Sequence, residues 1–76
     1  MPSYIATKLN GWISMVENDG IEEARKIPGY HDEPLSGNRK GQRSIRLSKA
    51  YRAIYEVKKD GQVEFLSVEE VHKHEY

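Results

Sequence analysis

The stretch "GQRSIRLSKAYRAIYEVKKDGQVEFLSVEEV", residues 41–71, decides the fold of this chain. Apolar and polar residues alternate through residues 43–47 and again through residues 51–57, which is typical of strands with one buried face. The link at residues 48–50 is short enough for a hairpin. Asp60-Gly61 then predicts a tight turn into a third strand. We therefore expect a three-stranded antiparallel meander.

The third strand changes its apolar parity. Val63 and Phe65 lie on one face of an extended chain, whereas Leu66 and Val68 lie at positions of the opposite parity. This pattern predicts either burial on both faces or a β-bulge.

Before the strands, apolar residues recur at steps of three and four and predict one helix over about Ser3–Glu17. "NDG" at residues 18–20 ends it, and "IEEARK" at residues 21–26 predicts a shorter helix that Pro28-Gly29 terminates. Residues 30–41 have the composition of a loop. The predicted fold is α+β: an N-terminal helix, or two, packed on the meander in a single domain of residues 1–76. The predicted helical stripe, with Trp12 as a core residue, is Ile5, Leu9, Trp12, Ile13 and Val16.

Size and composition narrow the protein class. The chain has 76 residues and no cysteine, so a disulfide framework and thiolate chemistry are excluded. No apolar run approaches the length of a membrane span, and the N-terminus lacks the pattern of a signal peptide. We expect a cytoplasmic protein without a membrane partner.

Charge is distributed unevenly although the formal net charge is zero. Residues 1–38 carry three basic and six acidic side chains, residues 39–59 carry eight basic and one acidic, and residues 60–76 carry one basic and five acidic. The three segments therefore have charges of −3, +7 and −4. The central segment predicts a surface that binds an anion, or one that meets an acidic partner.

Arg46 and Arg52 have the polarity of the solvent face of the first hairpin. If the two strands bring them together, they form a guanidinium pair suited to a phosphate. The alternative is that an exposed hairpin face is basic for solubility and edge protection.

His72 and His74 lie two residues apart and point the same way on an extended segment. General acid–base catalysis near neutral pH needs a group that can both accept and donate a proton, and histidine titrates in the required range. A zinc site lacks evident third and fourth ligands, and surface histidines at a chain end are the other alternative. Three further positions stay open: His31 and Glu33 are either functional or part of a solvated loop, and Tyr51 stacks on a base or packs in the core.

Residues 25–57 and 68–76 resemble the RelE/HigB/YafQ superfamily of bacterial type II toxins. The matching features are a Pro-Leu-x-Gly loop, a Gly-x-Arg entering a strand, a Tyr-Arg-x-x-Tyr strand and a histidine-containing end with a terminal tyrosine. The residues that carry them are Pro34, Leu35, Gly37, Gly41, Arg43, Tyr51, Arg52, Tyr55, His74 and Tyr76.

The resemblance implies a cytoplasmic mRNA endoribonuclease that acts on the ribosome without metal or cofactor and is inhibited by a cognate antitoxin. In this hypothesis Arg46 and Arg52 hold the phosphate, His74 is the acid or base, and Tyr76 and Lys73 orient the substrate. The predicted RNA-binding residues are Arg39, Lys40, Arg43, Lys49, His72 and Lys73.

Two alternatives share this fold: a ParE-like toxin that inhibits DNA gyrase, and an inactive remnant that only binds antitoxin. The resemblance also implies that the usual N-terminal strand and first helix are missing, so a hydrophobic edge should be exposed. We expect a homodimer, an exchange of elements between copies, or an antitoxin segment to cover it. In a homodimer the acidic segments of one copy would face the basic segment of the other.

Overall fold

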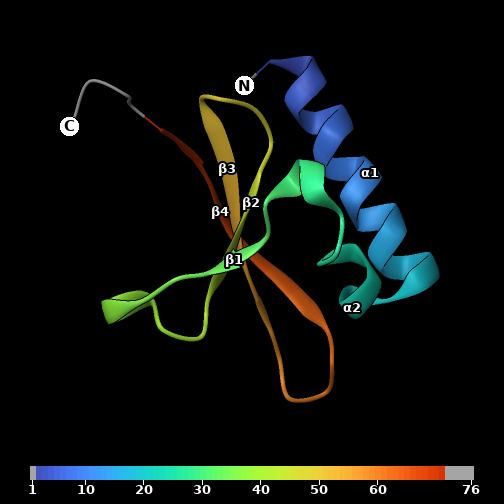
Figure 1. Ribbon diagram of the computed structural model, residues 1–76, viewed down its shortest axis with the longest axis vertical. Coiled ribbons are helices and arrows are strands. Elements are labelled where there is room, and N and C mark those ends of the chain that lie inside the picture. The colour runs from blue at the N-terminus through green and yellow to red at the C-terminus, as the bar shows by residue number, and fades with distance from the viewer. Residues whose placement is uncertain (1, 72–76) are drawn as a thin grey trace.

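The computed structural model describes residues 2–71. Two helices lie on one side of a four-stranded antiparallel sheet of order β1-β2-β3-β4, as Figure 1 shows. This arrangement confirms the predicted α+β class. The elements are α1 (Ser3–Asp19), α2 (Ile21–Ala24), a 3₁₀ turn η1 (Pro28–Tyr30), β1 (Glu33–Pro34), a second 3₁₀ turn η2 (Gly37–Arg39), β2 (Arg43–Arg46), β3 (Tyr51–Val57) and β4 (Val63–Glu70).

Helix α1 buries the predicted apolar stripe and ends two residues after the predicted range of Ser3–Glu17. Ile5 and Trp12 are fully buried, and Leu9, Ile13 and Val16 pack against the core while remaining partly exposed. The helix ends at Gly20, whose φ of 90° suits a residue without a Cβ and whose N–H donates to the Val16 carbonyl at 2.9 Å. The "NDG" segment is therefore the stop that the sequence predicts.

Aromatic rings connect the helix to the sheet. The Trp12 ring lies 4.8 Å from the Tyr55 ring and 5.6 Å from the Phe65 ring, measured between centroids. Tyr55 of β3 and Ile45 of β2 are completely buried. Contacts of this kind add to the stabilisation that burial of large rings provides, so Trp12 helps to hold α1 on the sheet. The prediction of Trp12 as a core residue is confirmed.

Strand β4 contains a β-bulge. Ile54 pairs with Ser67 and Tyr55 pairs with Phe65, so Leu66 has no partner on β3. The extra residue explains the change in parity and confirms the second of the two predicted possibilities. Leu66 and Val68 are 42% and 40% exposed.

The sheet has one strand more than the sequence predicts. Glu33 and Pro34 form β1, which pairs with Ser44 and Arg43 of β2, in a segment that we expected to be loop. Proline lacks an N–H and is tolerated on an edge strand, so Pro34 does not prevent this short pairing. The extra strand places the residues before the Pro-Leu-x-Gly loop beside β2.

The two faces of the sheet differ in character. Ile45 and Tyr55 point toward the helices, so by alternation Ser44, Arg46 and Arg52 point away from them.

Among residues 2–71, no helix is both long and apolar enough to cross a lipid bilayer.

Candidate functional site

A cleft of about 350 Å³ lies on the sheet face that points away from α1. Arg46, Lys49 and Arg52 give it a basic side, and His31 and Glu33 line it from the segment that enters β1. Ser44, a buried residue, and Tyr51 also line it. The cleft therefore combines groups that attract an anion with groups able to exchange protons.

The Arg46–Arg52 pair is set by strand register. The two residues are direct partners in the β2–β3 ladder, so their side chains emerge side by side on the same face. Like charges directly opposite each other are unfavourable in a sheet, and an anion between or beside them removes that cost. The structure thus brings together the two arginines that the sequence singled out.

A carboxylate on β4 meets one of these arginines. Glu69 is the β4 partner of Arg52, and its Oε1 accepts a hydrogen bond from Arg52 Nη2 at 3.1 Å. Arg39 of η2 donates to both Glu69 oxygens, at 3.2 and 2.6 Å. These hydrogen bonds, with that of Arg39 the strongest influence, lower the pKa of Glu69 to about 2. We call Arg39, Arg52 and Glu69 the cleft cluster, after Arg52, which lines the cleft.

Arg46 and Lys49 differ from Arg52, because within residues 2–71 neither forms an ion pair. Both side chains are exposed. Lys40 is exposed as well, but it does not line the cleft. Arg46 and Lys49 are therefore the cleft cations that an incoming anion meets without displacing a carboxylate.

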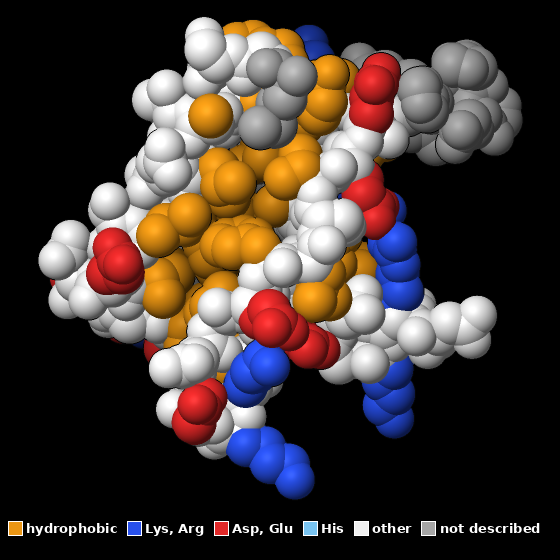
Figure 2. Space-filling model, turned by 180° about the vertical axis from the view of Figure 1, so that it is seen from behind, with side chains coloured by type: hydrophobic (Ala, Val, Ile, Leu, Met, Phe, Trp, Pro, Cys, Tyr) orange, Lys and Arg blue, Asp and Glu red, His pale blue; other side chains and the backbone are white. Residues whose placement is uncertain are grey.

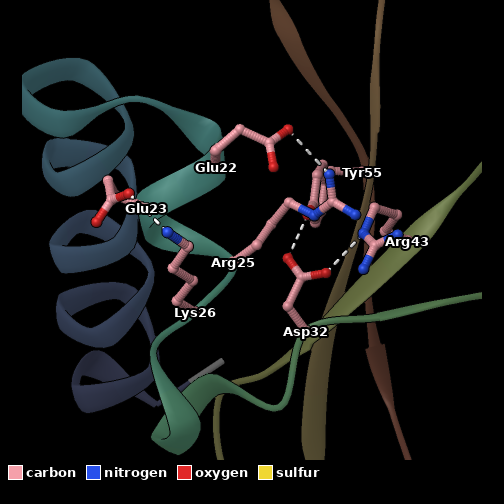
Figure 3. Close-up of polar contacts among 7 residues, drawn as sticks. All are labelled: Glu22, Glu23, Arg25, Lys26, Asp32, Arg43 and Tyr55. Carbon is pink, nitrogen blue, oxygen red and sulfur yellow. Dashed lines mark hydrogen bonds and ion pairs between the residues drawn. The ribbon is translucent and has the colours of Figure 1, made fainter.

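Arg43 lies on the other face of the sheet, away from the cleft. Its Nε donates to Asp32 Oδ1 at 2.6 Å, and the Tyr55 hydroxyl donates to Asp32 Oδ2 (Figure 3). The Asp32 side chain is fully buried. Burial, reinforced by the Asp32 carboxylate, raises the pKa of Tyr55 above its usual range. We call Asp32, Arg43 and Tyr55 the buried cluster.

His31 and Glu33 are placed in the cleft by the backbone around them. Glu33 belongs to β1 and is the partner of Ser44. His31 ends η1 with φ 45° and ψ 51°, a left-handed conformation that is uncommon for a residue with a side chain. The sequence left both residues open between a functional and a loop role, and the structure brings them toward the arginines.

Other predicted residues are placed as follows. Tyr51 both packs against the core and lines the cleft, so the two alternatives for it are not exclusive. His72, Lys73, His74 and Tyr76 lie outside the residues that the structure describes. Asp32 was not singled out from the sequence, although alternation in "HDE" places it on the side opposite His31 and Glu33. From residue 2 to residue 71, no group of three His, Asp or Glu side chains is arranged to hold a metal ion.

Comparison with known proteins gives one informative result. Neither a family model nor a curated protein sequence matches the chain. A solved structure, "YoeB/ParE toxin from Agrobacterium tumefaciens", superimposes with a TM-score of 0.70 at 20% sequence identity, covering 95% of this chain and 80% of that one. The chain therefore has the fold of a YoeB/ParE toxin, as its resemblance to the superfamily implies.

Proposed function

We propose that this protein is the toxin of a bacterial toxin–antitoxin pair and that it cleaves mRNA on the ribosome without a metal ion. The observation that supports this most strongly is the Arg46–Arg52 pair, which faces a cleft lined by His31 and Glu33. The fold shared with a YoeB/ParE toxin supports the toxin assignment. The cytoplasm, where ribosomes and mRNA are found, is the compartment that this function requires.

The proposed chemistry assigns the phosphate to the arginines. Arg46 lacks a carboxylate partner among residues 2–71 and approaches the scissile phosphate first, while Arg52 uses one of its five donors on Glu69 and keeps others for the developing negative charge. Lys49 adds charge at the rim, and Arg39 acts indirectly by holding Glu69. Fixed donors aimed at charge that develops in the transition state make a large contribution to rate.

Proton transfer is the second requirement. The ribose 2′-hydroxyl must lose a proton and the leaving 5′-oxygen must gain one. Glu33 and His31 line the cleft and are candidates for these roles on the β1 side. The sequence-based roles of His74 as acid or base and of Tyr76, Lys73 and His72 as substrate-contacting residues remain part of the proposal.

Primer extension on a reporter transcript tests the proposed activity. In a translating extract the protein should produce cuts that disappear when ribosomes are withheld. The main alternative is a ParE-like inhibitor of DNA gyrase, and it is favoured by the fact that Arg39, Arg43 and Arg52 are already paired with carboxylates. Intact transcripts together with inhibited DNA supercoiling would establish that alternative. If transcripts stay intact and supercoiling is not inhibited, the protein is a remnant that only binds antitoxin.

A cognate antitoxin is the protein partner that we propose. Figure 2 shows apolar side chains gathered over the middle of one face, where a partner could cover them. Val57, Leu66 and Val68 are 39%, 42% and 40% exposed, and a groove of about 520 Å³ lies between α1 and the start of β4. Its apolar lining is Trp12, Ile13, Val16, Val63 and Phe65.

Without antitoxin, the same apolar face should support a homodimer. Sedimentation velocity at low micromolar concentration should show self-association, and Leu66→Asp combined with Val68→Asp should abolish it because each change places a charge in the interface. A wild-type monomer that unfolds cooperatively and binds no antitoxin would contradict both partner proposals.

A further inference from the structure

In the segment His31-Asp32-Glu33, the outer two residues face the cleft and the middle residue is anchored in the core. His31 and Glu33 line the cleft, whereas the side chain of Asp32 between them is fully buried on the opposite side. Two residues that face a site are thus joined through one residue that faces the core. Any force that holds Asp32 also fixes the backbone from which its two neighbours project.

The attachment of Asp32 uses both carboxylate oxygens. Oδ1 accepts from Arg43 Nε at 2.6 Å and Oδ2 accepts from the Tyr55 hydroxyl (Figure 3). Arg43 and Tyr55 are direct partners in the β2–β3 ladder, so both donors come from neighbouring strands. The Tyr55 ring in turn packs against Trp12. The attachment point therefore belongs to the core.

The backbone at His31 needs such support. A histidine with φ 45° and ψ 51° is in a sparsely populated region, and strain of this kind persists only where the surrounding structure holds it. Support comes from both sides: Tyr30 donates its hydroxyl proton to the Lys8 carbonyl at 2.8 Å, and Asp32 is held by the buried cluster. Release of either side would let the chain relax toward an ordinary conformation.

We propose that Asp32, Arg43 and Tyr55 are positioning residues that hold His31 and Glu33 in place opposite the Arg46–Arg52 pair. The chemistry in this inference rests on the proposed function, but the positioning itself does not. Because Arg46 and Arg52 lie on β2 and β3 rather than on this segment, loss of the buried cluster should leave RNA affinity nearly unchanged. It should reduce the chemical step, since misplacement of a reacting group is costly to rate.

The test uses Tyr55→Phe, which keeps the ring beside Trp12 and removes only the hydroxyl. Asp32→Asn is the second variant, because it keeps the size of the side chain and removes its charge. Met15→Ala is the matched control: it weakens packing of α1 against the core, on the helix side of the sheet and outside the proposed binding surfaces. Single-turnover cleavage and ¹⁵N heteronuclear NOEs at residues 31–33 are measured for all three, and binding is measured with a 2′-O-methyl RNA oligonucleotide that cannot be cleaved.

We expect Tyr55→Phe and Asp32→Asn to lower the cleavage rate about 10- to 10²-fold, with little change in oligonucleotide affinity and with lower NOEs at residues 31–33. Met15→Ala should change none of the three. Unchanged NOEs in the two cluster variants, or losses equal to those in Met15→Ala, would overturn the inference. Absence of cleavage by the wild-type protein would overturn the proposed function instead, and the NOEs would still decide whether the buried cluster orders the segment.

Discussion

The buried cluster and the cleft cluster are both built from arginine and carboxylate, but they lie on opposite faces of the same sheet. In the buried cluster the Asp32 side chain is inaccessible to solvent and binds one arginine and one tyrosine. In the cleft cluster the Glu69 side chain is 26% exposed and binds two arginines. The first arrangement has no room for another anion, whereas water or a phosphate can compete for the second. Similar ion pairs therefore stabilise the fold at one site and prepare an anion-binding surface at the other.

The largest expected effect is a fall in the RNA cleavage rate when the cleft cluster loses an arginine. Arg52→Ala removes a charge partner from the cleft and should lower the single-turnover rate of RNA cleavage about 10²- to 10³-fold. Lys58→Ala is the control, because the Lys58 ammonium contacts Glu64 at 3.3 Å on the exposed hairpin. At saturating ribosome concentration the control should retain the wild-type rate. Equal rates for the two variants would show that the cleft is not the site.

The next effect should separate the clusters by stability. Asp32→Ala leaves Arg43 and the Tyr55 hydroxyl without their buried acceptor, so the free energy of unfolding should fall by about 3 kcal/mol. Glu69→Ala should cost much less, because the arginines that it releases can be solvated. Urea unfolding followed by circular dichroism measures both. The comparison would fail if Glu69→Ala destabilised the protein as much as Asp32→Ala.

The smallest expected effect is the loss at acidic pH of the stability that Glu69 provides. The pKa of Glu69 is lowered from 4.5 to about 2 in the folded protein, so its ionised form is favoured by folding. The stability from Glu69 is fully present above pH 4.5 and is lost as the pH falls toward about 2. Wild type should exceed Glu69→Gln in stability near neutral pH, and the difference should vanish near the lower limit. Urea titrations across this range measure it, and a difference independent of pH would contradict the assignment.

Local patterns in the sequence predict the helix and the hairpins, and they limit the irregularity of β4 to a bulge or burial on both faces. Spacing of apolar residues fixes α1 and parity fixes the faces of β2 and β3, since both depend on neighbours a few residues away. Strand β1 escaped prediction because two residues carry no periodicity and one of them is Pro34. Its existence depends on pairing with β2 across the intervening loop.

The charge pattern shows where local inference ends. The basic central segment predicts an anion-binding surface, and Arg46 and Lys49 remain consistent with that. However, the acidic segments on either side supply Asp32 and Glu69, which pair with Arg43, Arg39 and Arg52 inside one chain. Such pairing depends on contacts far apart in the sequence, so segment charges alone cannot identify which arginines stay available.

The position of Trp12 makes the protein its own optical probe. Trp12 is the single tryptophan, it is fully buried, and its indole N–H has no hydrogen-bond partner among residues 2–71. An indole in such an apolar setting emits at shorter wavelength than one in water, and the adjacent Tyr55 can transfer excitation to it. Intrinsic fluorescence will therefore report separation of α1 from the sheet while remaining insensitive to events in the cleft on the other face.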